Sequence, residues 1–358
     1  MTDFPIHAGL PKRYGGALPA AADVVVIGGG IIGVMTAWYL AERGQSVVLC
    51  EKGRIAGEQS SRNWGWIRQQ GRDFAELPIM MESLALWQQI ADEMPEIGFR
   101  SSGTMYLARS HEEMFGFENW ATEARGMGLD VRMQSTTQVY GRYDRAAVLW
   151  VGGLFTESDA CADPWVAVPM MAEGAVRRGV TIFEDCAVRR LERAGGRVSG
   201  VVTELGTVGC DQVVVAGGAW SSLFLQAEGV RIPQLSVLAS VAQTVALPEV
   251  VEGCMRDGRI GITRRRDGGY SIAPRGTHDF FLGPDAFRAV GKYLPELRRD
   301  FRSTQFRLAA PKNYPDAWPT RRTWAGDEVS PFERMRVLNP APRSRKAPTG
   351  SPSRRLRP

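Results

Sequence analysis

Three glycines near the start of the chain have the spacing of a nucleotide-binding turn. Gly28, Gly30 and Gly33 follow the apolar residues 24–27 and open a second apolar segment. In such a turn the first glycine permits a tight bend, the second lets the backbone approach a pyrophosphate, and the third lets a helix pack closely on the sheet. The phosphates then bind the free amides at the positive end of that helix. We therefore expect a dinucleotide at this turn.

Glu51 is the expected contact to a ribose. It lies 23 positions after Gly28, near the spacing of about 20 residues expected for an acid that binds ribose hydroxyls. A carboxylate at this position repels a 2′-phosphate, so NADP is disfavoured. Glycines alone are a weak signal, but here a strand, a helix, a second strand and a terminal acid follow one another in register.

The elements that must position these residues predict an α/β fold. Apolar spacing predicts helices and strands over most of the chain. The helices are expected over residues 74–93, 112–128, 164–178 and 284–299, and the strands over 24–27, 180–183, 188–192, 198–204, 211–216 and, as short alternating segments, 232–282. This order predicts a Rossmann-like domain built from discontinuous segments, with an inserted α+β domain that contains an antiparallel sheet.

The positive charge of the chain is concentrated at its C-terminal end. The 358 residues are 44% hydrophobic, enough for a sizeable core, and carry a net charge of +5. Residues 339–358 hold five arginines and Lys346 without an acid, so the rest of the chain has a net charge of −1. This basic tail has five prolines and no aromatic residue for base stacking. We expect it to be disordered, and we predict no nucleic-acid partner.

The composition predicts neither a membrane span nor a metal site. Residues 24–40 are largely apolar but contain four glycines and are barely long enough to span a bilayer. Residues 1–22 form a leader without the features of a signal peptide, so a cytoplasmic protein is expected. The five cysteines form no CxxC pair and the three histidines are scattered, which favours buried reduced thiols and gives no sign of a metal site or a catalytic triad.

Four motifs occur in a specific order. The first is the glycine turn in its long form, which includes Ile32 and is followed by Glu51 and Lys52. The second is the loop of residues 57–63, the third is Asp163-Pro164 with a later strand through Val188, and the fourth is the segment 211–221. In this order they resemble the D-amino-acid oxidase-like family of FAD-dependent oxidoreductases, of the glycine oxidase, sarcosine oxidase and D-amino-acid dehydrogenase type. The resemblance runs from about residue 24 to residue 338.

This resemblance implies FAD as the cofactor. The implied contacts come from all four motifs: Gly28, Gly30, Ile32, Gly33, Glu51, Lys52, Ser60, Ser61, Arg62, Asn63, Val188, Ala216, Gly217, Gly218 and Trp220. Some relatives attach flavin covalently, through a histidine in the region of Trp64 or a cysteine near the C-terminus. Residues 59–68 contain no histidine and no cysteine follows Cys254, so we expect noncovalent FAD.

The resemblance also implies oxidation of a carbon–nitrogen bond. A small amino acid or secondary amine would transfer a hydride to flavin, and the imine would hydrolyse; the cofactor supplies the difficult step. The protein orients the substrate, usually through an arginine that binds its carboxylate. Arg68 is the candidate, unless it forms a surface ion pair with Asp73 or Glu76. Tyr270 is a second candidate, although strand alternation could turn it away from the substrate.

The expected domains follow from the motifs. Residues 23–72 and 150–225 would form the FAD-binding domain, and residues 73–149 and 226–338 the substrate domain with its connecting elements. Relatives continue beyond the equivalent of Leu338 with a segment that supplies a substrate-binding arginine, so a catalytically impaired remnant is one alternative. An NAD-dependent dehydrogenase is another. Substrate identity, electron acceptor and oligomeric state cannot be read from the sequence.

Overall fold

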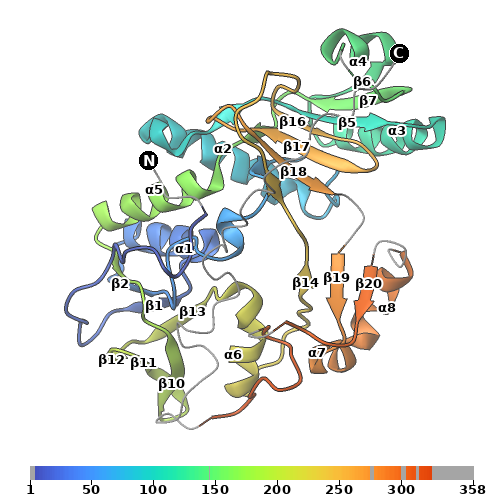
Figure 1. Cartoon of the computed structure of the whole chain (residues 1–358). Coiled ribbons are helices and arrows are strands. Elements are labelled where there is room, and N and C mark those ends of the chain that lie inside the picture. Colours follow the sequence, from blue (N-terminus) through green and yellow to red (C-terminus); the bar gives the residue numbers. More distant parts are fainter. Residues whose placement is uncertain (1–4, 145, 275–277, 300–303, 312–313, 325–358) are drawn as a thin grey trace, which may run out of the picture.

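A parallel sheet of four strands holds the glycine turn. The structure is a computed structural model, and it describes residues 5–144, 146–274, 278–299, 304–311 and 314–324. The strand order is β13-β1-β2-β9, with every neighbouring pair parallel. These strands are β1 (Val24–Ile27), β2 (Val47–Cys50), β9 (Thr181–Phe183) and β13 (Gln212–Val215). Segments far apart in the sequence therefore build one sheet, as expected for a Rossmann-like domain (Figure 1).

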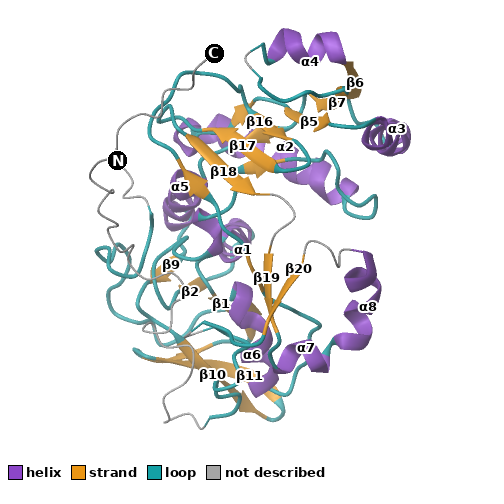
Figure 2. Cartoon of the chain, turned by 45° about the vertical axis from the view of Figure 1, so that its right-hand side comes forward, coloured by secondary structure: helices purple, strands orange, loops and turns teal. Residues whose placement is uncertain are grey.

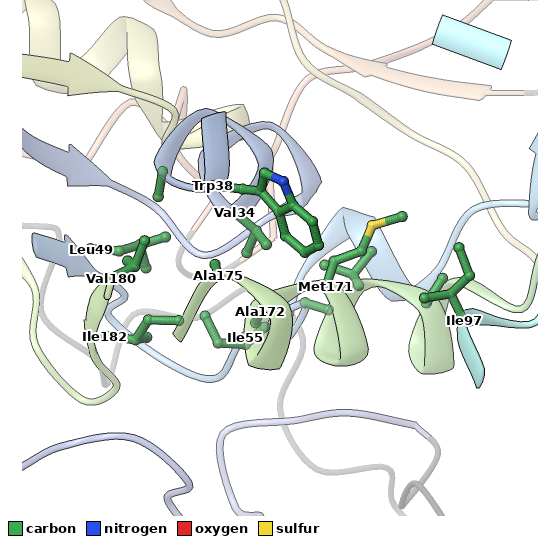
Figure 3. Close-up of a cluster of buried hydrophobic side chains, with 14 of the residues drawn as sticks. Val34, Trp38, Leu49, Ile55, Ile97, Met171, Ala172, Ala175, Val180 and Ile182 are labelled. Atoms are coloured by element: carbon green, nitrogen blue, oxygen red, sulfur yellow. The ribbon is translucent and has the colours of Figure 1, made fainter. Parts of the chain in front are cut away.

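Two helices cover one face of this sheet. They are α1 (Ile31–Glu42) and α5 (Pro164–Arg177), which lie against each other. Val34 and Trp38 of α1 and Met171 of α5 are buried in one apolar cluster with strand residues such as Leu49 (Figure 3). Burial of this cluster fixes the start of α1, and with it the glycine turn, against the end of β1.

A small antiparallel sheet covers the other face. It consists of β10 (Val188–Ala194), β11 (Arg197–Thr203) and β12 (Gly206–Gly209). Val25 points into this second cluster, whereas Val24 and Val26 belong to the first, as the alternation of a strand requires. Helix α6 (Ser221–Ala227) follows β13 through a short 3₁₀ turn over Gly218–Trp220 and also packs here.

A second, larger sheet lies above the first in Figure 1. Its order is β15-β18-β17-β16-β5-β7-β6, and it is antiparallel except for the β16–β5 pair. The strands are β5 (Thr104–Ala108), β6 (Val131–Ser135), β7 (Gly152–Thr156), β15 (Ala242–Gln243), β16 (Cys254–Arg256), β17 (Ile260–Arg264) and β18 (Tyr270–Pro274). The long helices α2 (Leu77–Glu93) and α3 (His111–Gly126) pack on one face of β5 and β7, and α4 (Thr136–Arg142) packs on the other.

Two further sheets of three strands complete the described part of the fold. One connects the two large sheets and contains β3 (Trp66–Ile67), β4 (Arg100–Ser101) and β8 (Ala160–Cys161). The other contains β14 (Val237–Leu238), β19 (His278–Phe281) and β20 (Thr304–Arg307). The helices α7 (Pro284–Arg288) and α8 (Val290–Arg299) lie beside β19 and β20 (Figure 2).

The α/β fold class is confirmed, with two differences in detail. The single helix expected over 284–299 is two helices separated at Ala289. The strands between residues 236 and 247 belong to two different sheets, because β14 pairs with β19 and β15 pairs with β18. All five cysteines are buried and unbonded, as expected. The basic tail of residues 339–358 lies outside the described residues. No helix in the described part of the chain is both long and apolar enough to cross a membrane.

Candidate functional site

The glycine turn has the geometry that its sequence predicts. Gly28 has a φ of +113°, and a Cβ atom there would lie 2.5 Å from the carbonyl oxygen of Ala216. A Cβ on Gly33 would overlap the carbonyl oxygen of Gly28. Only glycine satisfies both conditions, because larger residues rarely adopt this φ and would push the helix from the sheet. The turn therefore brings the start of α1 close to the ends of β1 and β13.

Glu51 closes the turn from the neighbouring strand. Its Oε2 accepts a hydrogen bond from the Gly29 amide at 2.7 Å, and its Oε1 accepts one from the Gly53 amide at 2.6 Å. Burial raises the pKa of this carboxyl, while the two amides act in the opposite direction. A buried acid with one oxygen on the glycine turn and the other on the loop after β2 is at the position expected for the ribose end of a dinucleotide site.

A cavity lies directly at the glycine turn. Its lining comes from all four sequence motifs and from residues next to them. These residues are Ile27, Gly28, Gly30, Cys50, Glu51, Lys52, Glu58, Gln59, Ser60, Ala187, Val188, Val215, Ala216, Gly217, Gly218, Ala219, Trp220, Ser221 and Phe224. We call this the dinucleotide cavity. A glycine cradle at the start of a helix with a carboxylate beside it fits the diphosphate and ribose of FAD.

Most of the predicted cofactor contacts line this cavity. The ten that do are Gly28, Gly30, Glu51, Lys52, Ser60, Val188, Ala216, Gly217, Gly218 and Trp220. Lys52 places its Nζ 3.6 Å from the centre of the Trp220 ring, and burial lowers its pKa to about 8. Four segments separated by up to about 190 residues thus meet at one site, which only the folded chain could demonstrate.

The other five predicted contacts lie elsewhere. Ile32 is 68% exposed on the first turn of α1 and does not line the cavity, because helical rotation turns it away. Gly33 acts through helix packing. Ser61 is fully buried, and Arg62 binds the carbonyl oxygens of Gly57 and Ile6, which holds the loop in place. Asn63 lines a neighbouring cavity instead.

This neighbouring cavity has a volume of about 550 Å³ and shares one lining residue with the dinucleotide cavity. Ser60 lines both, and its Oγ accepts a hydrogen bond from the Ile31 amide at 2.9 Å. We call it the aromatic cavity. It is lined by aromatic, aliphatic and cationic residues: Ile31, Ser60, Asn63, Trp64, Gly65, Trp66, Ile67, Arg68, Arg72, Met80, Ser83, Trp87, Tyr106, Ala162, Pro164, Val168 and Arg256. Three guanidinium groups and no carboxylate are among these residues, so the lining favours an anion.

Arg68 is held within the aromatic cavity and does not form the surface ion pair that was its alternative. Its Nη1 donates to the carbonyl oxygen of Gln70 and, at 2.7 Å, to the hydroxyl oxygen of Tyr106. It is Arg72 that approaches Glu76, at 3.7 Å. Arg256 of β16 lies over the Tyr106 ring, 3.5 Å from its centre. The aromatic ring therefore positions two cations in one cavity.

Tyr270, the second substrate candidate, lies elsewhere. It is 3% exposed in the core between the large sheet and α4. Its hydroxyl accepts a hydrogen bond from the Val250 amide at 2.8 Å and donates to the carbonyl oxygen of Pro248 at 3.2 Å. The residue lines neither the dinucleotide cavity nor the aromatic cavity. This placement argues against a contact with substrate, because the alternation of β18 turns the ring into the core.

Comparison with known proteins identifies the family. The family model described as FAD dependent oxidoreductase, abbreviated DAO, matches residues 23–349. The chain belongs to this family. Family membership confirms the resemblance seen in the sequence, and FAD dependence argues against the NAD-dependent alternative.

Several relatives of this DAO family member have been characterised. The chain is 30% identical over 219 residues to glycine oxidase of Pseudomonas putida, an alignment that covers 59% of each chain. It is 27% identical over 244 residues to sarcosine oxidase subunit beta of Rhizobium meliloti, covering 66% of this chain and 59% of the relative. The matches span between 24% and 59% of the length of the curated relatives.

Solved structures match more of the DAO chain. L-amino acid deaminase from Proteus vulgaris is 33% identical with a TM-score of 0.85, and the match covers 92% of this chain and 78% of that one. L-amino acid deaminase from Proteus myxofaciens, solved in complex with anthranilate, is 32% identical with a TM-score of 0.85, and covers 92% and 75%. The two relatives and two solved structures named here are thus oxidases or deaminases of amino acids.

Tyr106 and Arg256 are the site residues that sequence reasoning missed. Tyr106 lies within a strand of five buried residues, and Arg256 lies at the end of a three-residue strand. Strand alternation could have placed Met105 and Leu107 on one face and Tyr106 on the other. It could not have shown that the Tyr106 face meets α2 and the loop after β3.

Proposed function

We propose that this chain binds FAD noncovalently in the dinucleotide cavity and oxidises the carbon–nitrogen bond of an amino acid bound in the aromatic cavity. The observation that carries the proposal is Ser60, which lines both cavities. A cofactor held at the glycine turn would border the cavity that contains the guanidinium groups. Residues 23–72 and 150–225 would form its domain, since all four strands of the parallel sheet fall within them.

Each part of the two cavities has a role in this proposal. The glycine turn and Glu51 hold the diphosphate and ribose, and the residues from Ala216 to Trp220 approach the cofactor from β13. Bound FAD supplies a hydride acceptor. Arg68 binds the substrate carboxylate and so orients its α-carbon. Trp64, Trp66 and Tyr106 exclude water around the reacting carbon.

The aromatic cavity favours an amino acid with a sizeable side chain. Three tryptophans and Tyr106 line this cavity, a wall that offers a bulky apolar side chain more contact than glycine or sarcosine could make. The similarity to L-amino acid deaminases supports the same conclusion, since one of these neighbours was solved with anthranilate, an aromatic carboxylate. We therefore propose amino acids with bulky apolar side chains as the substrate class, and anthranilate as a ligand.

A flavin measurement tests the cofactor part. Purified protein should absorb near 450 nm, and acid or urea should release all of the flavin into the supernatant. A preparation that is colourless and does not take up added FAD would favour the impaired remnant. Flavin that stays with the precipitated chain would show covalent attachment.

A substrate screen tests the chemical part. FAD-loaded protein should be reduced under anaerobic conditions by amino acids with bulky side chains, with glycine and sarcosine as poor substrates. The formation of a 2-oxo acid and ammonia would identify deamination. Failure of all amino acids and secondary amines to bleach the flavin would overturn the assignment.

The buried cysteines support a reducing compartment. All five are unbonded, and reduced thiols are typical of cytosolic proteins. We propose the cytoplasm, to be tested by fractionation of cells that express the chain.

A further inference from the structure

The orientation of Arg68 depends on one backbone carbonyl. The carbonyl oxygen of Gln70 accepts hydrogen bonds from Nη1 of Arg68 and, at 3.0 Å, from the hydroxyl of Tyr106. The same Arg68 nitrogen donates to the Tyr106 hydroxyl. The three groups therefore form a closed triangle, and a shift of the Gln70 peptide would move both side chains within the aromatic cavity.

This carbonyl belongs to a tight turn over Gln69–Arg72. The amide of Arg72 donates to the carbonyl oxygen of Gln69 at 3.2 Å, and Gly71 has a φ of +68°. The turn packs against the Tyr106 ring, since a Cβ atom on Gly71 would lie 2.7 Å from a ring carbon. Gln69 and Gln70 of this turn are polar and buried, so their amides need acceptors inside the protein.

The carboxylate of Asp159 supplies the acceptors for these amides. Its Oδ1 accepts a hydrogen bond from the Gln69 amide at 2.7 Å, and its Oδ2 accepts one from the Gln70 amide at 3.3 Å. The side chain of Gln69 also donates to Oδ1, at 3.4 Å. Asp159 is fully buried between β7 and β8, and it lies outside the lining of either cavity. The mechanism above does not use this carboxyl.

We propose that Asp159 is a positioning residue, which fixes the Gln69–Arg72 turn so that Arg68 and Tyr106 meet the substrate carboxylate in the aromatic cavity. This inference rests on the proposed function for the role of Arg68. The hydrogen bonds between Asp159 and the turn are present in the chain without any ligand. The hydrogen bonds from these two amides to a buried carboxylate are stronger than hydrogen bonds to neutral acceptors, because the acceptor is charged.

The ionisation of Asp159 adds a pH dependence. Burial raises its pKa to about 6, against the lowering effect of the Gln69 amide, the Thr104 hydroxyl and the Gln70 amide. The titratable group that faces it from β16 is the thiol of Cys254, whose own pKa burial raises well above the usual value. On the other side, Ser158 separates it from Asp130, which accepts hydrogen bonds from the Ser158 amide and hydroxyl. Because these amides lower the pKa, they bind the ionised carboxylate more tightly than the protonated one. A turn that opens while Asp159 stays buried should therefore loosen as the pH falls through about 6, in contrast to global unfolding, which exposes the carboxyl.

Hydrogen exchange tests the hold on the turn without any cofactor. In the full-length chain at neutral pH, Asp159→Asn should speed exchange in the peptide that contains residues 67–72 by about tenfold, the effect of losing one charged hydrogen bond. Asp130→Asn is the matched control, since it removes a carboxylate from the same region and leaves the Gln69 and Gln70 amides bound. Equal exchange in the parent and in Asp159→Asn would overturn the inference.

Ligand binding tests the consequence for Arg68. With FAD-loaded protein, calorimetry should show that Asp159→Asn weakens anthranilate binding about tenfold at neutral pH. The parent should lose affinity as the pH falls from about 7 to about 5.5, and the variant should not, because it has no proton to bind at this position. A merely structural role would lower affinity without changing this pH profile, and an unchanged profile would overturn the inference.

The two measurements separate the possible failures. Absence of FAD or anthranilate binding in the parent would contradict the proposed function, while hydrogen exchange would still decide the role of Asp159. If Asp159→Asn does not fold, the pH dependence of hydrogen exchange in the parent protein tests the inference. After correction for intrinsic exchange rates, its 67–72 peptide must lose protection between about pH 7 and pH 5.5, and constant protection would refute the inference.

Discussion

The Oε2 atom of Glu51 lies 2.7 Å from the Gly29 nitrogen, so the acid at the end of β2 and the turn after β1 form one hydrogen-bonded unit. In the chain without ligand, this carboxylate satisfies two buried amides, of Gly29 and Gly53. The proposed role of Glu51 in binding a ribose is therefore combined with a role in shaping the turn.

Glu51→Ala should weaken FAD binding at least tenfold. The loss corresponds to about 1.4 kcal/mol, the contribution of one charged hydrogen bond. Fluorescence titration of the purified, folded variant with FAD would measure it. Asp23→Ala is the control, because Asp23 binds Ser46 and does not line the dinucleotide cavity. Unchanged affinity in Glu51→Ala would refute the contact.

Gly33→Ala should destabilise the fold by about 1–3 kcal/mol, the usual cost of forcing extra volume into a packed contact. The new methyl group would overlap the carbonyl oxygen of Gly28. Gly116→Ala is the matched control, since Gly116 lies within α3 and a Cβ there would meet no atom within 4 Å. The control should be neutral or stabilising by up to about 1 kcal/mol. Urea denaturation of both variants would show the difference, and equal midpoints would contradict it.

Arg68→Lys should raise the KM for an amino-acid substrate about tenfold while FAD stays bound. A lysine cannot bind a carboxylate with two parallel donors, whereas the guanidinium has Nε and Nη2 left when Nη1 binds Gln70 and Tyr106. Arg132→Lys is the control, because Arg132 is an exposed residue paired with Glu157 at 3.0 Å. An unchanged KM in Arg68→Lys would show that another cation binds the substrate carboxylate. Arg256, which lines the same cavity, would be tested next.

The stability of the fold should respond to the titration of Asp159. Its pKa of about 6 in the folded chain lies above the ordinary value of 3.8. Between these values the native state binds more protons than the unfolded state, so the contribution of this group to the free energy of unfolding decreases as the pH rises. Asp159→Asn cannot titrate. Its Tm relative to the parent should therefore rise from about pH 4 to about pH 6.5 and then level off. Calorimetry at matched pH values would show this, and a constant difference would contradict it.

Local sequence determined the nucleotide-binding half of the protein. The glycine spacing, the apolar strands and the acid after β2 constrain neighbours along the chain, and such short-range constraints follow from backbone sterics and strand alternation. That is why Gly28, Gly30 and Glu51 could be placed at a cavity before the fold was known. The same reasoning failed for Ile32, where the rotation of one helical residue decides which way a side chain points.

Apart from Arg68, which the family resemblance had already named, the arrangement of the aromatic cavity was decided by the tertiary structure. Arg68, Tyr106 and Asp159 come from three separate segments, and nothing in their local sequences shows that Gln70 joins the first two and that Asp159 holds Gln70. Tyr270 was also a candidate in sequence, yet it is buried in an apolar cluster, where its hydroxyl binds the backbone of Val250 and Pro248. The sequence by itself determined which cofactor class the chain is built for, because that motif is local. Which side chains share the second cavity depends on long-range packing between sheets, which no spacing along the chain encodes.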